Sequence, residues 1–136
     1  MKPVFFYGLF MDEGLLKGKG LSPSGVEIAF AEGFGLRVGE RASLVESEGE
    51  RAYGLIMFLS REELKALYGE KSVSDYQPEK LTVTTSNNKN IVATTYNLPV
   101  EKLTGQNREY ARSLTALAKN VGLPPEYIEE IEKWTV

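Results

Sequence analysis

The sequence predicts an α+β fold, with a strand-rich body, one short internal helix and a helical C-terminal part. Short apolar or alternating runs separated by Gly, Pro and Asn dominate the first hundred residues. Apolar residues at helical spacing dominate the last third of the chain. The 136 residues, 42% of them hydrophobic, match the size of one ordinary domain. We therefore expect residues 1–136 to form a single domain.

Seven short segments have the composition and alternation of β-strands. They cover residues 4–6, 26–30, 34–38, 43–45, 52–59, 80–85 and 91–96. A polar turn is expected at residues 47–50. An Asn-rich turn at residues 87–90 predicts that the last two strands form a hairpin.

Helix signals occur in three places after the first turn of the chain. Ser60 and Glu63 fit a capping box, and Gly69 is expected to end the helix that they begin. A second helix has its apolar face formed by Tyr110, Leu114, Leu117 and Val121, and it is expected to end at Gly122. Pro124-Pro125 predicts the start of a third helix, with an apolar face formed by Tyr127, Ile128, Ile131 and Trp134.

The composition excludes several classes of function. The net charge is −3 and the chain has no basic stripe, which argues against a nucleic-acid partner. It has no apolar stretch of membrane-spanning length and no secretory signal, so a cytoplasmic location without a membrane partner is expected. With no cysteine and no histidine, thiol chemistry and the commonest general base are absent. Catalysis would have to use carboxylates, tyrosines, lysines, hydroxyls or backbone groups, and no metal or other cofactor is expected.

The first strand leads directly into a glycine turn at Tyr7-Gly8. Gly8 permits close approach of other atoms to the backbone. Successive backbone N–H groups in such a turn can cradle an anion. From the residues alone, the turn either closes the fold or holds a ligand.

Glu70 follows the glycine that ends the short internal helix, and Tyr76 stands six residues further on. An isolated glutamate at such a place is typical of a solvated surface acid. However, Glu70 comes after the Tyr7-Gly8 turn and the apolar strand 52–59, and together these motifs form an ordered set along the chain.

This ordered set resembles the γ-glutamylcyclotransferase superfamily, which includes the AIG2-like proteins. Tyr7-Gly8-Leu9-Phe10 stands where that family has Tyr-Gly-Ser-Leu. Ala42-Ser43-Leu44 and residues 52–59 look like the next two family segments, and Leu67, Glu70 and Tyr76 are similar to the segment after them, with one residue fewer between Leu and Glu. The tail at residues 108–131 is similar to the end of the glutathione-pathway branch.

The resemblance implies a small mixed β-barrel with short flanking helices. It implies conversion of a γ-glutamyl amino acid or γ-glutamylamine to 5-oxoproline and a free amine, without a cofactor. Glu70 would be the general acid/base, and the turn at Tyr7, Gly8, Leu9 and Phe10 would hold the substrate α-carboxylate. The positions that would face the ligand are Tyr76, Tyr96 and Tyr110. Tyr110 fits packing in its helix equally well, and Tyr127 fits packing better.

Three positions depart from the family pattern. Leu9 replaces the usual serine, Tyr68 stands where Asp is frequent, and Gln77-Pro78 replaces an Arg that often follows the tyrosine. Loss of the serine hydroxyl predicts weak turnover of simple γ-glutamyl amino acids. It also leaves open a non-catalytic small-ligand binding module of the same fold. Two further alternatives remain. An interaction protein without a ligand would have a filled cavity, and a glycoside hydrolase would need a second acid beside Glu70. The particular γ-glutamyl compound and the oligomeric state stay open.

Overall fold

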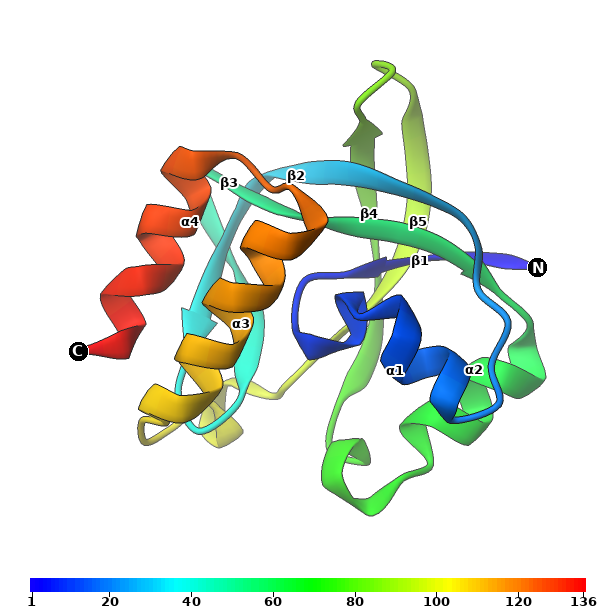
Figure 1. The fold of residues 1–136 in the computed structure, drawn as a ribbon, viewed down its shortest axis with the longest axis horizontal. Helices are drawn as coiled ribbons and strands as arrows, with labels where there is room; N and C mark the ends of the chain where they lie inside the picture. Colours follow the sequence, from blue (N-terminus) through cyan, green and yellow to red (C-terminus); the bar gives the residue numbers. More distant parts are fainter.

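The structure, a computed structural model, describes residues 1–136 as five β-strands and four α-helices joined by turns and short 3-10 segments (Figure 1). The strands are β1 (Lys2–Phe6), β2 (Ser24–Val38), β3 (Ala42–Leu59), β4 (Gln77–Thr85) and β5 (Asn90–Asn97). The helices are α1 (Glu13–Gly18), α2 (Arg61–Tyr68), α3 (Arg108–Val121) and α4 (Pro125–Glu132). The 3-10 segments are η1 (Leu9–Met11), η2 (Lys71–Val73), η3 (Val100–Lys102) and η4 (Lys133–Thr135).

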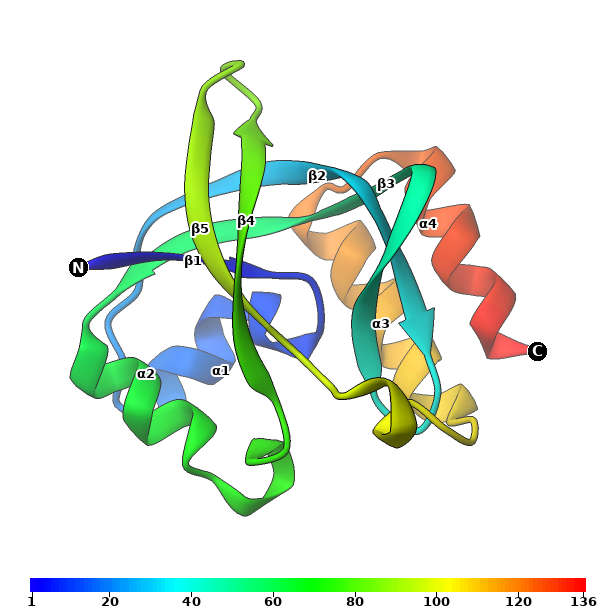
Figure 2. The ribbon, with the colours of Figure 1, turned by 180° about the vertical axis from the view of Figure 1, so that it is seen from behind.

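The strands form a closed barrel in the order β1-β3-β2-β4-β5. The pairs β1·β3, β2·β3, β2·β4 and β4·β5 are antiparallel, and β1 meets β5 in parallel at Val4 and Thr94. The expected small mixed barrel of the α+β class is therefore confirmed. The predicted hairpin is also present, and its tip projects beyond the other strands (Figures 1 and 2).

The middle of the barrel differs from the prediction. Four predicted strands between residues 26 and 59 are two long strands, β2 and β3, and the polar turn expected at residues 47–50 is wrong because these residues lie inside β3. Gly33 and Gly49 adopt left-handed φ angles of 79° and 87°, and the pairing slips between Glu32 and Phe34. Such a bulge bends a strand without ending it.

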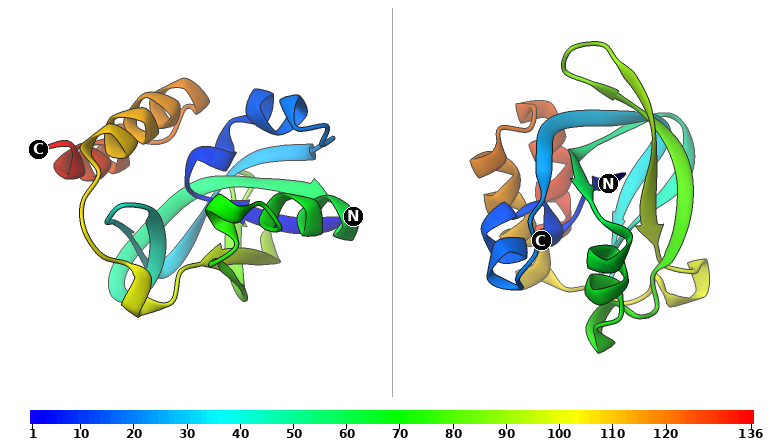
Figure 3. Two further views of the ribbon diagram at one scale, coloured as in Figure 1. Left: turned by 90° about the horizontal axis from the view of Figure 1, so that it is seen from below. Right: turned by 90° about the vertical axis from the view of Figure 1, so that its right-hand side faces the viewer.

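The helices follow their local signals. The Ser60 N–H donates to the Glu63 carboxylate at 2.8 Å, and the Glu63 N–H donates to the Ser60 hydroxyl at 3.1 Å, which confirms the capping box of α2. Gly122 ends α3 in the left-handed conformation, with φ 85°. Helices α3 and α4 lie side by side, and α2 lies apart from them (Figures 1 and 3). The expectation that Trp134 belongs to the buried face of the last helix is wrong, because α4 ends at Glu132 and Trp134 is 37% exposed.

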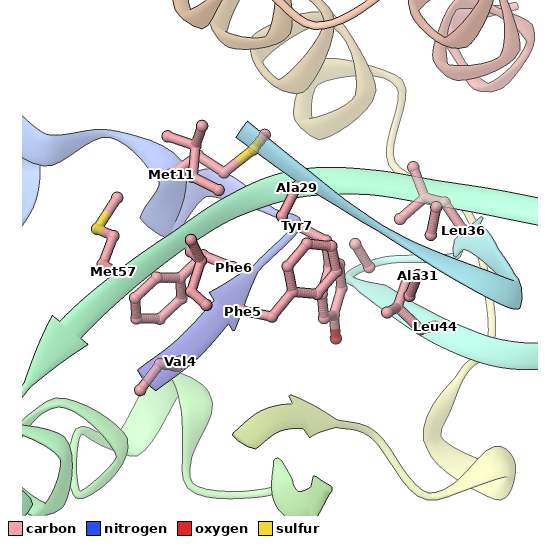
Figure 4. Packing of buried hydrophobic residues seen from close by; sticks show 14 of the residues in the cluster. Val4, Phe5, Phe6, Tyr7, Met11, Ala29, Ala31, Leu36, Leu44 and Met57 are labelled. Carbon is pink, nitrogen blue, oxygen red and sulfur yellow. The ribbon is translucent and has the colours of Figure 1, made fainter. Parts of the chain in front are cut away.

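Strand β1 runs through the hydrophobic core. Its residues Val4, Phe5 and Phe6 are at most 3% exposed, and they pack with side chains from β2 and β3 (Figure 4). A Cβ atom at Gly54 of β3 would overlap the carbonyl oxygen of Phe6, so this glycine permits the close approach of the two strands. Burial on all sides holds the end of β1, and with it the turn at Tyr7-Gly8, in a defined position.

None of the four helices has the length and apolar character that a membrane-spanning helix needs.

Candidate active site

A cavity of about 330 Å³ opens at the end of β1. Its walls contain all of the site residues that the sequence analysis named: Tyr7, Gly8, Leu9, Phe10, Glu70, Tyr76, Tyr96 and Tyr110. The volume lies at the lower end of the range for small-molecule pockets. The cavity therefore brings these residues together, while their roles stay predictions.

The glycine turn forms one wall of the cavity. The Met11 N–H donates to the Gly8 carbonyl at 3.0 Å, which starts the 3-10 segment η1 and leaves the preceding N–H groups without partners inside that segment. A Cβ atom at Gly8 would lie 2.9 Å from the Tyr110 hydroxyl oxygen. Gly8 thus allows α3 to place Tyr110 directly against the turn.

The backbone N–H groups of Leu9 and Ala42 influence the Tyr110 hydroxyl. Burial raises the pKa of Tyr110 to about 12, and the N–H groups of Leu9 and Ala42 act in the opposite direction because they favour the phenolate. Leu9 follows β1 and Ala42 begins β3, so the barrel brings together donors that are far apart in sequence. Backbone N–H groups that are directed at an oxygen atom stabilise negative charge on it.

Tyr7 joins the turn to the neighbouring strand β5. Its hydroxyl lies 2.6 Å from the Tyr96 carbonyl oxygen and 2.8 Å from the Asn97 side-chain oxygen, so its single proton is shared between two acceptors. Burial raises the pKa of Tyr7 well above its ordinary value. Both acceptors belong to the protein, so these contacts tie the residue before Gly8 to β5.

The remaining tyrosines form an aromatic wall. Tyr68 stacks on Tyr96 with ring centroids 3.7 Å apart, and the Tyr76 hydroxyl donates to the Ala42 carbonyl at 2.6 Å. Burial raises the pKa of both Tyr68 and Tyr76, which keeps these phenols neutral. In the sequence, Tyr68 stands out only as a departure from the family pattern. In the structure its ring takes part in the cavity wall.

Glu70 lies immediately before η2, with its carboxylate at the cavity and its side chain 38% exposed. The Lys19 ammonium contacts both carboxylate oxygens, at 2.8 and 2.9 Å. Lys19 lies just beyond α1 and is 51 positions from Glu70 in sequence. No motif or periodicity in the sequence pointed to it.

Arg41 is a second cation in the cavity wall that the sequence analysis missed. Its guanidinium donates to the Asp75 carboxylate at 3.2 Å and to the Ser72 carbonyl at 3.3 Å, and it lies 5.6 Å from the centre of the Tyr76 ring. The Lys102 ammonium also contacts the Asp75 carboxylate, at 3.0 Å. No group of three or more carboxylate, histidine or cysteine side chains gathers at a common point in the structure.

The closed barrel and its terminal helices define the fold of the γ-glutamyl cyclotransferases. Over 96% of its length the chain is similar to 86% of a solved "Gamma-glutamyl cyclotransferase", with a TM-score of 0.77 and 20% identity. It is also similar to YkqA from Bacillus subtilis, with a TM-score of 0.79, 20% identity and coverage of 98% of this chain and 54% of that one. A yeast γ-glutamyl cyclotransferase specific to glutathione matches with a TM-score of 0.68, 12% identity and coverage of 98% and 95%.

The sequence itself identifies the family. Residues 51–131, more than half of the chain, match the AIG2-like family, and the chain belongs to it. No curated protein matches the chain in a sequence search.

Proposed function

We propose that this protein is a γ-glutamylcyclotransferase-type enzyme that converts a γ-glutamyl amino acid or γ-glutamylamine to 5-oxoproline and a free amine. The observation that carries the proposal is that the Glu70 carboxylate and the glycine turn line the same small cavity. Membership of the AIG2-like family supports the proposal, as does the likeness to solved structures named γ-glutamyl cyclotransferase.

In this proposal the substrate binds with its α-carboxylate at the turn. The N–H groups of Leu9 and Ala42 favour negative charge on the Tyr110 oxygen, and they would stabilise a substrate carboxylate oxygen at this place in the same way. The tyrosine rings enclose the aliphatic part of the glutamyl chain. This arrangement holds the substrate α-amine on the side of Glu70.

The reaction needs proton transfer and positioning. The substrate ammonium gives a proton to Glu70, and the free amine then attacks the γ-carbonyl carbon. A new carbon–nitrogen bond closes the five-membered lactam, and the old amide bond breaks as Glu70 delivers its proton to the leaving nitrogen. Glu70 then takes the second proton from the attacking nitrogen, which leaves the neutral lactam, and this proton passes to the free amine, which departs as an ammonium. Because the nucleophile is tethered to the carbonyl, much of the entropic barrier is already removed.

Substitution of Glu70→Gln tests the proposal. Glutamine has nearly the same size but accepts no proton, so kcat for 5-oxoproline release is expected to fall ~10²–10⁴-fold. Binding is expected to persist, because the carboxylate cradle lies elsewhere. The measurement is 5-oxoproline release from a panel containing γ-glutamylalanine, γ-glutamylethylamide and γ-glutamyl-ε-lysine, with binding followed by calorimetry.

Glu62→Gln is the matched control, because Glu62 is exposed in the first turn of α2 and does not line the cavity. It is expected to keep the wild-type rate. A Glu70→Gln variant with the wild-type rate would remove Glu70 from the mechanism. Binding of the panel by the wild-type protein without any 5-oxoproline release would instead support the non-catalytic binding module.

A further inference from the structure

The Lys19–Glu70 contact places a cation beside the group that is proposed to move the proton. The Lys19 side chain is 29% exposed, less than that of Lys17 in the same helical segment at 62%. Its backbone is held at the end of α1, where the Lys19 N–H donates to the carbonyl oxygens of Leu16 and Lys17. Lys19 therefore presents its ammonium to the cavity from an anchored position.

The charged residues in and around the cavity leave an excess of positive charge. Three cations, Lys19, Arg41 and Lys102, face two carboxylates, Glu70 and Asp75, which gives a formal charge of +1. The Asp75 carboxylate contacts both Arg41 and Lys102, and all three side chains are partly exposed to solvent. Lys19 has Glu70 as its one acidic partner.

We propose, on the basis of the cyclotransferase function above, that Lys19 determines specificity by binding a carboxylate on the leaving half of the substrate. Lys19 would then favour γ-glutamyl amino acids, whose leaving group carries this carboxylate, over γ-glutamylamines, which lack it, whatever the absolute rate that Leu9 allows.

The geometry of the reaction places such a carboxylate within reach of Lys19. Glu70 returns a proton to the leaving nitrogen, so its carboxylate lies within hydrogen-bond distance of that atom. In an amino acid leaving group, the carboxylate is attached to the carbon next to this nitrogen. The Lys19 ammonium lies 2.8 Å from the same Glu70 carboxylate. A lysine ammonium on its flexible stem can turn to a neighbouring oxygen without backbone movement.

Exchange of partners provides the energetic reason for the preference. The incoming substrate ammonium needs the Glu70 oxygens that the Lys19 ammonium contacts. With a γ-glutamylamine, Lys19 would lose its partner and stay near a second cation, which is unfavourable. With a γ-glutamyl amino acid, Lys19 moves to the second carboxylate while Glu70 receives the ammonium. The net charge of −1 on that substrate also complements the +1 of the site.

The test compares γ-glutamylalanine with γ-glutamylethylamide, which differ only by the carboxylate on the leaving half. We expect the wild-type protein to favour γ-glutamylalanine roughly 10–100-fold in kcat/KM, the range that a charged hydrogen bond supplies. In Lys19→Met this ratio is expected to fall to within about threefold of unity, and Lys19→Arg is expected to restore part of it. Lys17→Met, which removes an exposed lysine outside the cavity, is expected to leave both the ratio and the rates unchanged.

The outcomes separate this proposal from the proposed function. If 5-oxoproline is released but Lys19→Met keeps the wild-type ratio, the specificity role is overturned while the function stands. If neither substrate releases 5-oxoproline, the function fails and calorimetry decides on Lys19. Tighter binding of γ-glutamylalanine that is lost in Lys19→Met would still support the carboxylate site. Equal binding of the two compounds, or no binding, would overturn it.

Discussion

At the scale of single residues, Leu9 stands at the position where the γ-glutamylcyclotransferase pattern has serine. Its side chain lines the cavity and packs partly against the core, and its N–H favours negative charge on the Tyr110 oxygen. Leucine therefore keeps the backbone donor of the turn but replaces a hydroxyl donor with apolar bulk. This combination is the physical basis for expecting slow turnover of simple γ-glutamyl amino acids.

Leu9→Ser is expected to raise kcat/KM for 5-oxoproline release from γ-glutamylalanine roughly two- to tenfold, because the new hydroxyl adds one hydrogen bond to the bound substrate. Leu9→Ala is the matched control, since it removes the bulk without adding a donor. The rates are measured with both variants checked for thermal stability. Equal rates in wild type and Leu9→Ser would show that the hydroxyl is unimportant at this position. The substrate ratio used to test Lys19 is independent of this absolute rate.

At the scale of elements, the close pairing of β1 with β3 positions the glycine turn. The register places Phe6 of β1 opposite Leu55 of β3, beside Gly54. A side chain at Gly54 would meet the Phe6 backbone, and it would also lie 3.0 Å from the Phe5 ring. The strand that carries the turn therefore has little freedom to shift within the barrel.

Gly54→Ala is expected to reduce the free energy of unfolding by about 1–3 kcal/mol, because the added methyl group overpacks two strands in the core. Gly18→Ala serves as the comparison, since nothing lies within 4 Å of a Cβ atom at that helical position. It is expected to be neutral or to stabilise the protein by up to about 1 kcal/mol. Chemical denaturation measures both. An unchanged stability of Gly54→Ala would mean that β1 and β3 separate easily.

At the scale of the whole molecule, Asn97 joins three strands behind the cavity. This side chain is 4% exposed, and its oxygen lies 2.8 Å from the Tyr7 hydroxyl and accepts the Leu44 N–H at 3.1 Å. Its amide nitrogen donates to the Glu79 carboxylate of β4 at 2.6 Å. Tyr7 and Leu44 belong to the β1 and β3 end of the strand order, whereas Glu79 and Asn97 belong to the β4 and β5 end. Asn97 therefore helps to close the barrel.

Asn97→Leu is expected to lower the free energy of unfolding by about 1–3 kcal/mol, since buried polar groups of Tyr7 and Leu44 lose a partner. The 5-oxoproline release rate is expected to fall as well, because Tyr7 anchors the turn. Asn120→Leu, at an exposed position of α3, is the control and is expected to leave stability within about 0.5 kcal/mol of wild type. If Asn97→Leu and Asn120→Leu unfold alike, closure of the barrel does not depend on this contact.

The sequence by itself determined those features that depend on neighbouring residues. The apolar run of β1, the capping box of α2, the left-handed glycine after α3 and the β4–β5 hairpin all follow from short patterns, and the structure confirms them. Ordered motifs, read as a family resemblance, also named the residues that meet in the cavity. Tyr127, which fitted packing better than ligand binding, is 7% exposed and lies against Tyr53.

Only the tertiary structure decided how these pieces join. Glycines in left-handed conformations let β2 and β3 continue through segments that look like turns, because pairing with a long partner strand outweighs the local preference. The stacking of Tyr68 on Tyr96, the effect of the Ala42 N–H on Tyr110 and the Lys19–Glu70 contact have no signature in the sequence. Each joins residues that are at least 28 positions apart, and such pairs come together only when the barrel closes.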